Sequence, residues 1–221
     1  DVKYKAGVGG LPIPVVHGMT LGELAYMANE EGWLTWGKEN AKPLKCKLKV
    51  IKCKNYTHDK LYRLPLKPSP NLPDMRAIYL YPSTCYFEAT PVSLGRGTDK
   101  AFEMYGHPNM KGYLFSFIPR SVPGAKNPPQ LNKLCWGVDL RGLSDDEIIA
   151  KGFDLTYVID AYRNLNMGEK FFKRMFLLLT GVDYIKEMIM EGKSADEIRQ
   201  MWQKDVEEFK VLRRKYLLYE E

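Results

Sequence analysis

Apolar residues recur every three or four positions near both ends of the chain, which is the spacing of one face of an α-helix. Thr20 and Glu23 form a capping box before the first of these patterns, so we predict a helix over about 20–31. Ser194 and Glu197 form a second capping box, which opens a long amphipathic helix at the C-terminal end. Further helices are predicted over residues 145–166, 170–179 and 183–191.

Other segments have the patterns of β-strands. From Cys46 the chain alternates apolar and basic residues, and it shifts phase near Val50 before reaching Cys53. This pattern predicts a strand with a bulge and with its lysines on the solvated face. Short apolar runs predict strands over 77–81, 113–118 and 135–140. The predicted fold class is α+β, α/β-like in places, with a mixed β-sheet, packed helices and the long amphipathic C-terminal helix.

The length and composition favour a globular protein with one main domain. With 221 residues, 45% of them hydrophobic and 12% aromatic, the chain can build a core. Residues 1–15, rich in Gly and Pro, are predicted to be a linker or junction before a domain over 16–221. No apolar run reaches the roughly 18 residues that a membrane helix needs, so we expect no membrane span. The given sequence opens at Asp1 with no signal-peptide pattern, which is compatible with a mature or trimmed product, and the compartment stays open.

The net charge of +6 is concentrated in one basic stretch. Between Lys38 and Lys67 there are ten Lys or Arg residues, against only Glu39 and Asp59. Such a stretch can steer an anionic partner, or it can be a solvated edge whose lysines discourage aggregation between strands. Both interpretations stay open. We expect no nucleic-acid partner, because no aromatic stacking motif interleaves the basic residues.

Cysteine and histidine give no sign of a metal site. The four cysteines are too few and too scattered for a disulfide framework, and we interpret them as small buried hydrophobic residues: Cys46, Cys53, Cys85 and Cys135. His17 and His107 lack neighbouring ligands at the spacing of a metal site. His58 lies in the basic stretch and is predicted to be exposed. We expect neither a metal nor a cofactor, since no phosphate-binding or dinucleotide-binding motif is present.

The run from Ser69 to Pro108 collects most of the candidate chemistry among turn-forming Pro and Gly residues. Glu88 and Glu103 are the candidate catalytic residues, because hydrolysis of a glycosidic bond usually needs one carboxylic acid and a second carboxylate as nucleophile or base. Either carboxylate can instead be a structural partner of Arg96. The two interpretations are separated by geometry.

The other candidates in and near this run are substrate-binding residues. Arg96 stands between two glycines in a Gly-Arg-Gly-Thr motif that ends at Thr98, where its guanidinium can grip a carboxylate or bridge one of the two glutamates. The Asn71 side chain can contact a sugar or cap its own turn. The Tyr81 ring can stack on a sugar or pack in the core. The imidazoles of His17 and His107 can hydrogen-bond a sugar hydroxyl or serve as structural hydrogen-bonding groups.

These motifs, in this order, resemble the bacterial exo-β-N-acetylmuramidases of the NamZ family, and the resemblance covers nearly the whole chain. The matching segments are 12–24, 69–73, 81–84, 87–88, 95–98, 102–103 and 202–219. The resemblance implies a glycoside hydrolase that removes N-acetylmuramic acid from the non-reducing end of peptidoglycan fragments in cell-wall turnover. It also implies a periplasmic or secreted location.

The resemblance further implies that this chain is the C-terminal portion of such an enzyme, without the family's Rossmann-like N-terminal domain. The active cleft then lies between the two, and Glu88, Arg96 and Glu103 complete it or bind the substrate. The chain departs from the family pattern at Ala89, Pro91 and Ala101, which affects substrate detail more than fold. The alternatives are a non-catalytic sugar-binding domain for acidic cell-wall glycans, and an adaptor that holds an anionic polymer on its basic face.

Overall fold

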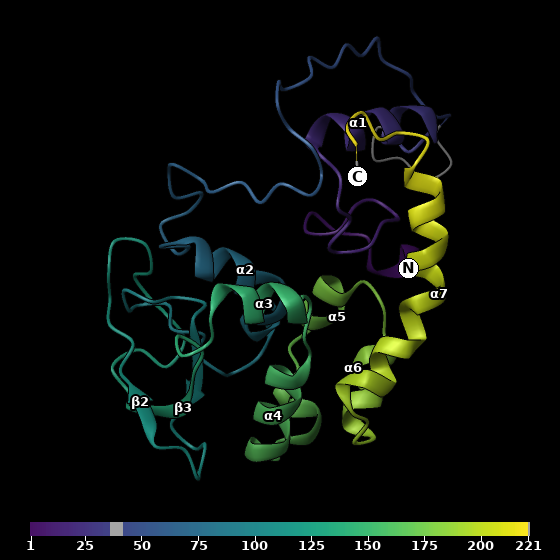
Figure 1. The fold of residues 1–221 in the computed structure, drawn as a ribbon. Coiled ribbons are helices and arrows are strands. Elements are labelled where there is room, and N and C mark those ends of the chain that lie inside the picture. The colour runs from purple at the N-terminus through teal and green to yellow at the C-terminus, as the bar shows by residue number, and fades with distance from the viewer. Residues whose placement is uncertain (36–41, 221) are drawn as a thin grey trace. The chain divides into compact units, whose positions relative to one another are not determined.

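The computed structural model describes residues 1–35 and 42–220, so Lys38 and Glu39 of the basic stretch lie outside the described residues. Contacts divide the chain into two compact units. Unit 1 holds Asp1–Gly9 and Arg63–Arg199, and unit 2 holds Gly10–Tyr62 and Gln200–Glu221. Figure 1 shows the helices and strands of both units. Among the helices of the described residues, none combines the length and the apolar character needed to cross a bilayer.

Unit 1 contains an antiparallel sheet of β1 (Met104–His107), β2 (Phe115–Phe117) and β3 (Cys135–Asp139), in the order β1-β3-β2. Gly106 faces Gly137 across the central pair, where a Cβ on Gly137 would lie 1.9 Å from the Tyr105 carbonyl oxygen. Only glycine allows the two strands to approach so closely. The predictions for β2 and β3 are confirmed, whereas the sequence pattern missed β1.

The helices that lie wholly within unit 1 are short. They are η1 (Val2–Tyr4), α2 (Met75–Thr84), η2 (Cys85–Ala89), α3 (Asp145–Lys151), α4 (Thr156–Leu165), η3 (Gly168–Phe171), α5 (Met175–Thr180) and α6 (Tyr184–Met190). The predicted helix over 170–179 was wrong at its start, because residues 172–174 separate η3 from α5. A capping box of Ser144 and Glu147 starts α3.

The predicted strand over 77–81 was wrong, since these residues lie in α2. The side chain of Asp74 accepts a hydrogen bond from the Ala77 amide and caps the helix. The residues that α2 buries, including Ala77, Leu80 and Thr84, recur every three or four positions. In a short apolar run this period and the alternation of a strand are easily confused, and the N-cap decides between them.

Aromatic residues form the core of unit 1 and tie its helices to its sheet. Phe87 of η2 stacks on Tyr105 of β1, with ring centroids 4.8 Å apart. The Asp160 carboxylate of α4 accepts hydrogen bonds from the Tyr105 and Tyr113 hydroxyls at 2.7 and 2.8 Å. In residues 1–15, Tyr4 is buried and donates to Asp183. The division into a linker and a domain stays a prediction.

Unit 2 is built on α1 (Leu21–Glu30) and on α7 (Ala195–Arg213), whose residues from 200 onward belong to it. Both predicted helices are confirmed, each with its capping box. Met27, Phe209 and Tyr216 form the core of this unit. With helices and a small sheet in one chain, the α+β fold class is confirmed.

The strand predicted from Cys46 to Cys53 was wrong, because this segment has no strand partner in the described residues. Without a sheet around it, every residue from Cys46 to Cys53 except the half-buried Val50 is exposed. Cys46 and Cys53 are exposed, so the prediction of buried cysteines is confirmed only for Cys85 and Cys135. His58 was predicted to be exposed, yet its side chain is only 13% exposed against Glu23.

Candidate functional site

Tyr81, Glu88 and Arg96 lie together in unit 1. They come from three consecutive pieces of chain: the last turns of α2, the short helix η2, and the loop over 95–98. In η2 every residue but Glu88 is buried, so the turn anchors its backbone and presents this one carboxylate toward solvent. We call these three residues the Glu88 cluster.

An ion pair forms the centre of the Glu88 cluster. The Arg96 Nη1 donates to the Glu88 Oε1 at 2.7 Å, and the two side chains are 34% and 29% exposed. The Arg96 Nε is buried and has no hydrogen-bond partner among the described residues. The exposed part of the guanidinium and of the carboxylate can meet a ligand.

Tyr81 is electrostatically coupled to this ion pair. The centroid of its ring lies 5.1 Å from that of the Phe102 ring, and Tyr81 is 40% exposed. Burial raises the pKa of the Tyr81 hydroxyl, Cys85 and the Glu88 charge raise it further, and Arg96 opposes them. Burial also raises the pKa of the Cys85 thiol to about 12, so this cysteine is no thiolate nucleophile at neutral pH.

The loop that carries Arg96 is shaped by its two glycines. Gly95 and Gly97 have φ of 81° and 86°, in the region that favours glycine. A Cβ on Gly97 would lie 2.4 Å from the Arg120 carbonyl oxygen, so the space beside this glycine is filled by protein. The Thr98 hydroxyl donates to the Gly95 carbonyl at 2.7 Å and closes the turn.

Glu103 belongs to a different cluster, at the start of α2. Its side chain is 2% exposed, and its Oε1 lies 3.6 Å from the Lys100 Nζ. Lys100 also donates to Asp74 at 2.8 Å. The Glu103 Oε1 has no hydrogen-bond partner among the described residues. We call Asp74, Lys100 and Glu103 the Glu103 cluster.

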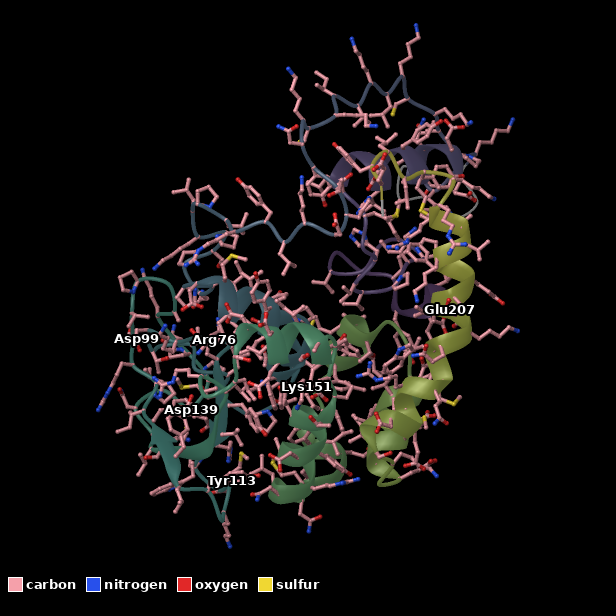
Figure 2. The ribbon with its side chains drawn as sticks, in the orientation of Figure 1. Arg76, Asp99, Tyr113, Asp139, Lys151 and Glu207 are labelled. Atoms are coloured by element: carbon pink, nitrogen blue, oxygen red, sulfur yellow. The ribbon has the colours of Figure 1, made fainter. Side chains whose placement is uncertain are left out.

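Burial raises the pKa of Glu103, and the neighbouring Asp74 charge raises it further against the opposing charges of Lys100 and Arg76. Arg76, labelled in Figure 2, is held by the Arg141 carbonyl and by Asp145. A carboxyl in such surroundings favours its protonated form. The direction of this shift is the one that a general acid needs, but Glu103 is not exposed.

The remaining candidates are engaged in local structure. Asn71 donates its Nδ2 to the Gly124 carbonyl at 2.9 Å and ties two loops together. His107, 8% exposed on β1, accepts from the Asn109 amide, and burial lowers its pKa. His17 lies in unit 2, where its Nδ1 accepts from the Met19 amide at 3.2 Å.

Sequence reasoning missed Asp74 and Lys100. An Asp placed before a helical pattern is an N-cap signal, and it was hidden when that pattern was interpreted as a strand. No sequence signal pairs Lys100 with a carboxylate 26 positions away. Within residues 1–35 and 42–220, no group of three or more His, Cys, Asp or Glu residues is placed to hold a metal.

Two family models match the chain. The model of the exo-beta-N-acetylmuramidase NamZ C-terminal region matches residues 79–219. That of the NamZ N-terminal region matches residues 1–76. The Glu88 cluster thus falls entirely within the C-terminal match. Asp74 of the Glu103 cluster lies in the N-terminal match.

The chain is also similar to longer proteins. It is 33% identical to the peptidoglycan beta-N-acetylmuramidase NamZ of Bacillus subtilis (strain 168), in a match that covers 99% of this chain and 54% of that protein. A DUF1343 family protein of Bacteroides fragilis NCTC 9343 is 64% identical, with a TM-score of 0.95, covering all of this chain and 61% of the other. A second crystal structure from that organism, 22% identical with a TM-score of 0.76 and 61% covered, shares the fold.

Proposed function

Because the chain belongs to the NamZ family of exo-β-N-acetylmuramidases, we propose that it is a glycosidase acting on peptidoglycan fragments. In this proposal it releases N-acetylmuramic acid from the non-reducing end, or forms the substrate-binding portion of an enzyme that does so. The chain spans about half of its Bacillus subtilis relative, 54% of that protein. We therefore include the rest of the family's N-terminal domain as its partner.

The observation that carries this proposal is the Glu88–Arg96 ion pair, which lies inside the NamZ C-terminal match. N-acetylmuramic acid bears a lactyl carboxylate, and a part-exposed guanidinium such as that of Arg96 can bind such a group through two hydrogen bonds. When that carboxylate binds Arg96, it competes with Glu88 and releases the glutamate toward the sugar. The exposed ring of Tyr81 supplies an apolar surface beside it.

Glu88 and Glu103 take different parts in this proposal. Glu88 is exposed enough to touch a sugar, and we assign it direct contact as acid, base or nucleophile. The raised pKa of Glu103 supports the role of an acid, whereas its burial opposes direct contact in the described conformation. Thr98, Asn71 and His107 then shape the loops around the site.

The test is to incubate the chain with N-acetylmuramyl-β-1,4-N-acetylglucosamine and to quantify free N-acetylmuramic acid. The Glu88→Gln variant is measured alongside, with Glu207→Gln as the control. Glu207 also sits in an ion pair of 2.7 Å, with Lys210 on α7, and it is labelled in Figure 2. Release that survives in the control but falls at least 100-fold in Glu88→Gln supports a catalytic role. Equal release from both variants contradicts it.

A non-catalytic sugar-binding domain is the second candidate, and the coverage of only 54% of the Bacillus subtilis relative favours it. Such a domain binds the disaccharide and releases no product. Calorimetric titration of Arg96→Ala checks the binding role common to both candidates, with Arg163→Ala as the control. Arg163 donates to the Gly192 carbonyl elsewhere in unit 1. Unchanged affinity in Arg96→Ala would eliminate the proposed contact with the lactyl carboxylate.

The location and the excluded partners are part of the proposal. Peptidoglycan lies outside the cytoplasmic membrane, which supports a periplasmic or secreted protein. We propose no nucleic-acid partner, no metal and no cofactor. Fractionation of cells that express the native gene tests the location, and recovery in the cytoplasm alone would contradict it. Retention on a nucleic-acid column at 0.15 M salt, where nonspecific binding is already weakened, would contradict the exclusion of nucleic acid.

A further inference from the structure

Residues 42–54 have the sequence of a strand but no sheet. Apolar and basic residues alternate from Leu44 to Val50, as in a strand with one buried face. In the described residues, however, no backbone hydrogen bond is made by any residue from Lys47 to Ile51. Five consecutive residues thus leave their N–H and C=O groups without a hydrogen-bond partner among residues 1–35 and 42–220. We call residues 44–53 the free segment.

The free segment is held in place on α1. The Asn29 side chain accepts from the Cys46 amide at 2.8 Å and donates to the Cys46 carbonyl at 3.2 Å, as a neighbouring peptide group would. Val50 packs over Gly22, where an added Cβ would lie 2.5 Å from the Val50 Cγ1. The Cys53 amide donates to the Tyr219 hydroxyl at 2.9 Å. A helix covers one face, as in an α/β layer, but the neighbouring strands are missing.

The free segment exposes apolar side chains. Ile51 is 84% exposed, and Leu48 and Leu44 are 40% and 41% exposed. Unpaired backbone groups beside exposed apolar side chains are a template for pairing with another strand. Anchored at both ends, the segment has already lost much of the conformational entropy that strand addition costs.

We propose that the free segment pairs with a β-strand from the part of the family's N-terminal domain that this chain does not span. This inference rests on the proposed function, which names that domain as the partner, and it adds the surface involved. The NamZ N-terminal model includes the free segment in its match to residues 1–76. The match covers only 54% of the Bacillus subtilis protein, so that relative is longer than the part this chain spans. The mode of binding is strand addition through main-chain hydrogen bonds.

The charge of the segment argues against a second copy as the occupant. Residues 42–54 hold six lysines and no acidic residue: Lys42, Lys45, Lys47, Lys49, Lys52 and Lys54. Two such segments side by side would place like charges opposite each other, which is destabilising. Edge lysines are a common protection against pairing between copies. A neutral or acidic strand from another domain carries no such penalty.

Amide hydrogen exchange tests the proposal. It is measured on this chain and on a chimera that joins this chain to the part of the 64% identical Bacteroides fragilis protein outside the match. Amides 47–51 should exchange rapidly in this chain and about 100-fold more slowly in the chimera. In the chimera, Lys49→Pro removes a backbone donor and should abolish the protection, while the matched Lys49→Ala should keep it.

The outcomes separate this inference from the proposed function, because release of N-acetylmuramic acid is measured on the same chimera. Release without protection of 47–51 overturns the strand pairing and leaves the glycosidase proposal intact. Protection of amides 47–51 without release of N-acetylmuramic acid supports the strand pairing and contradicts the glycosidase proposal. Protection in this chain alone that grows with concentration identifies a second copy as the occupant. Protection induced by an anionic glycan and lost at high salt identifies a polymer-binding face. Either of these last two results overturns the proposal.

Discussion

Two buried glutamates, one in each unit, show how differently the same side chain behaves in two surroundings. Glu23 in unit 2 is 0% exposed and Glu103 in unit 1 is 1% exposed. Burial would raise the pKa of Glu23, but hydrogen bonds from the Leu218 and Thr20 amides and from His58 lower it below the ordinary value. Burial raises the pKa of Glu103, which has an unpartnered oxygen among the described residues.

The difference teaches that the hydrogen-bond donors around these carboxyls, rather than the depth of their burial, decide the direction of their pKa shifts. The Glu23 carboxylate joins three distant parts of unit 2. One oxygen accepts from the Thr20 amide and hydroxyl, and the other contacts the His58 Nε2 at 3.0 Å and the Leu218 amide at 2.7 Å. Glu103 has a single ammonium nearby, that of Lys100 at 3.6 Å. Hydrogen-bond donors at the first site favour the charged form of Glu23, whereas burial at the second favours the neutral form of Glu103.

The largest expected effect follows from removing the satisfied carboxylate. Glu23→Ala should destabilise unit 2 by about 3–5 kcal/mol, because it leaves buried donors without an acceptor. In the wild type, the lowered pKa means that this stabilisation is present above about pH 4.5 and is lost as the pH falls. Urea unfolding monitored at pH 7 and pH 4 measures both effects.

The control for Glu23 is Glu147→Ala. Glu147 fills the same position in the Ser144 capping box of α3, accepting from the Ser144 amide at 2.7 Å and hydroxyl at 2.9 Å. It has no equivalent of the contacts to His58 and Leu218. If both variants lose equal stability, the capping box alone accounts for Glu23, and the comparison between the two buried sites fails.

A smaller effect, of opposite sign, is expected at Glu103. Since its pKa is raised in the folded state, ionisation costs stability as the pH rises above about 4.5, where the unfolded chain has already lost this proton. Glu103→Gln removes that cost. Between pH 4 and pH 7 the free energy of unfolding of the variant should therefore rise relative to that of the wild type by roughly 1–3 kcal/mol, which is the penalty of an unpaired buried acceptor. Thermal unfolding across this range checks it, and a parallel pH dependence of both proteins would show that Glu103 is satisfied.

Much of the fold could be predicted from the sequence, and the errors have a common physical cause. Capping boxes identified α1 and α7 because the cap chemistry is local. The 77–81 run and the 46–53 run were both assigned as strands, and neither is one in the structure. The alternation of apolar and polar residues indicates which side chains would lie on the same face of a strand. A strand forms, however, only when another strand supplies its backbone hydrogen bonds. That information lies outside the segment.

The site was predicted in part. The sequence drew attention to Tyr81, Glu88 and Arg96, and the structure brings them together because α2, η2 and the following loop are adjacent in the chain. It also drew attention to Glu103, which the structure places beside Asp74 and Lys100, and the shared catalytic role of Glu88 and Glu103 stays a prediction. Fifteen positions of separation carry no information about distance in space, and Asp74, which completes the Glu103 cluster, precedes both.

The smallest expected effect on stability separates the exposed Glu88 from both buried glutamates. Because the Glu88 and Arg96 side chains are 29% and 34% exposed, solvent screens their ion pair. Such a pair contributes about 0–1 kcal/mol, so Arg96→Ala should shift the unfolding midpoint little. Its effect on disaccharide affinity should be much larger, since the guanidinium is the proposed carboxylate ligand. A large loss of stability with unchanged affinity would make the pair a structural bridge, and Glu88 would then resemble Glu23 rather than a residue held ready for substrate.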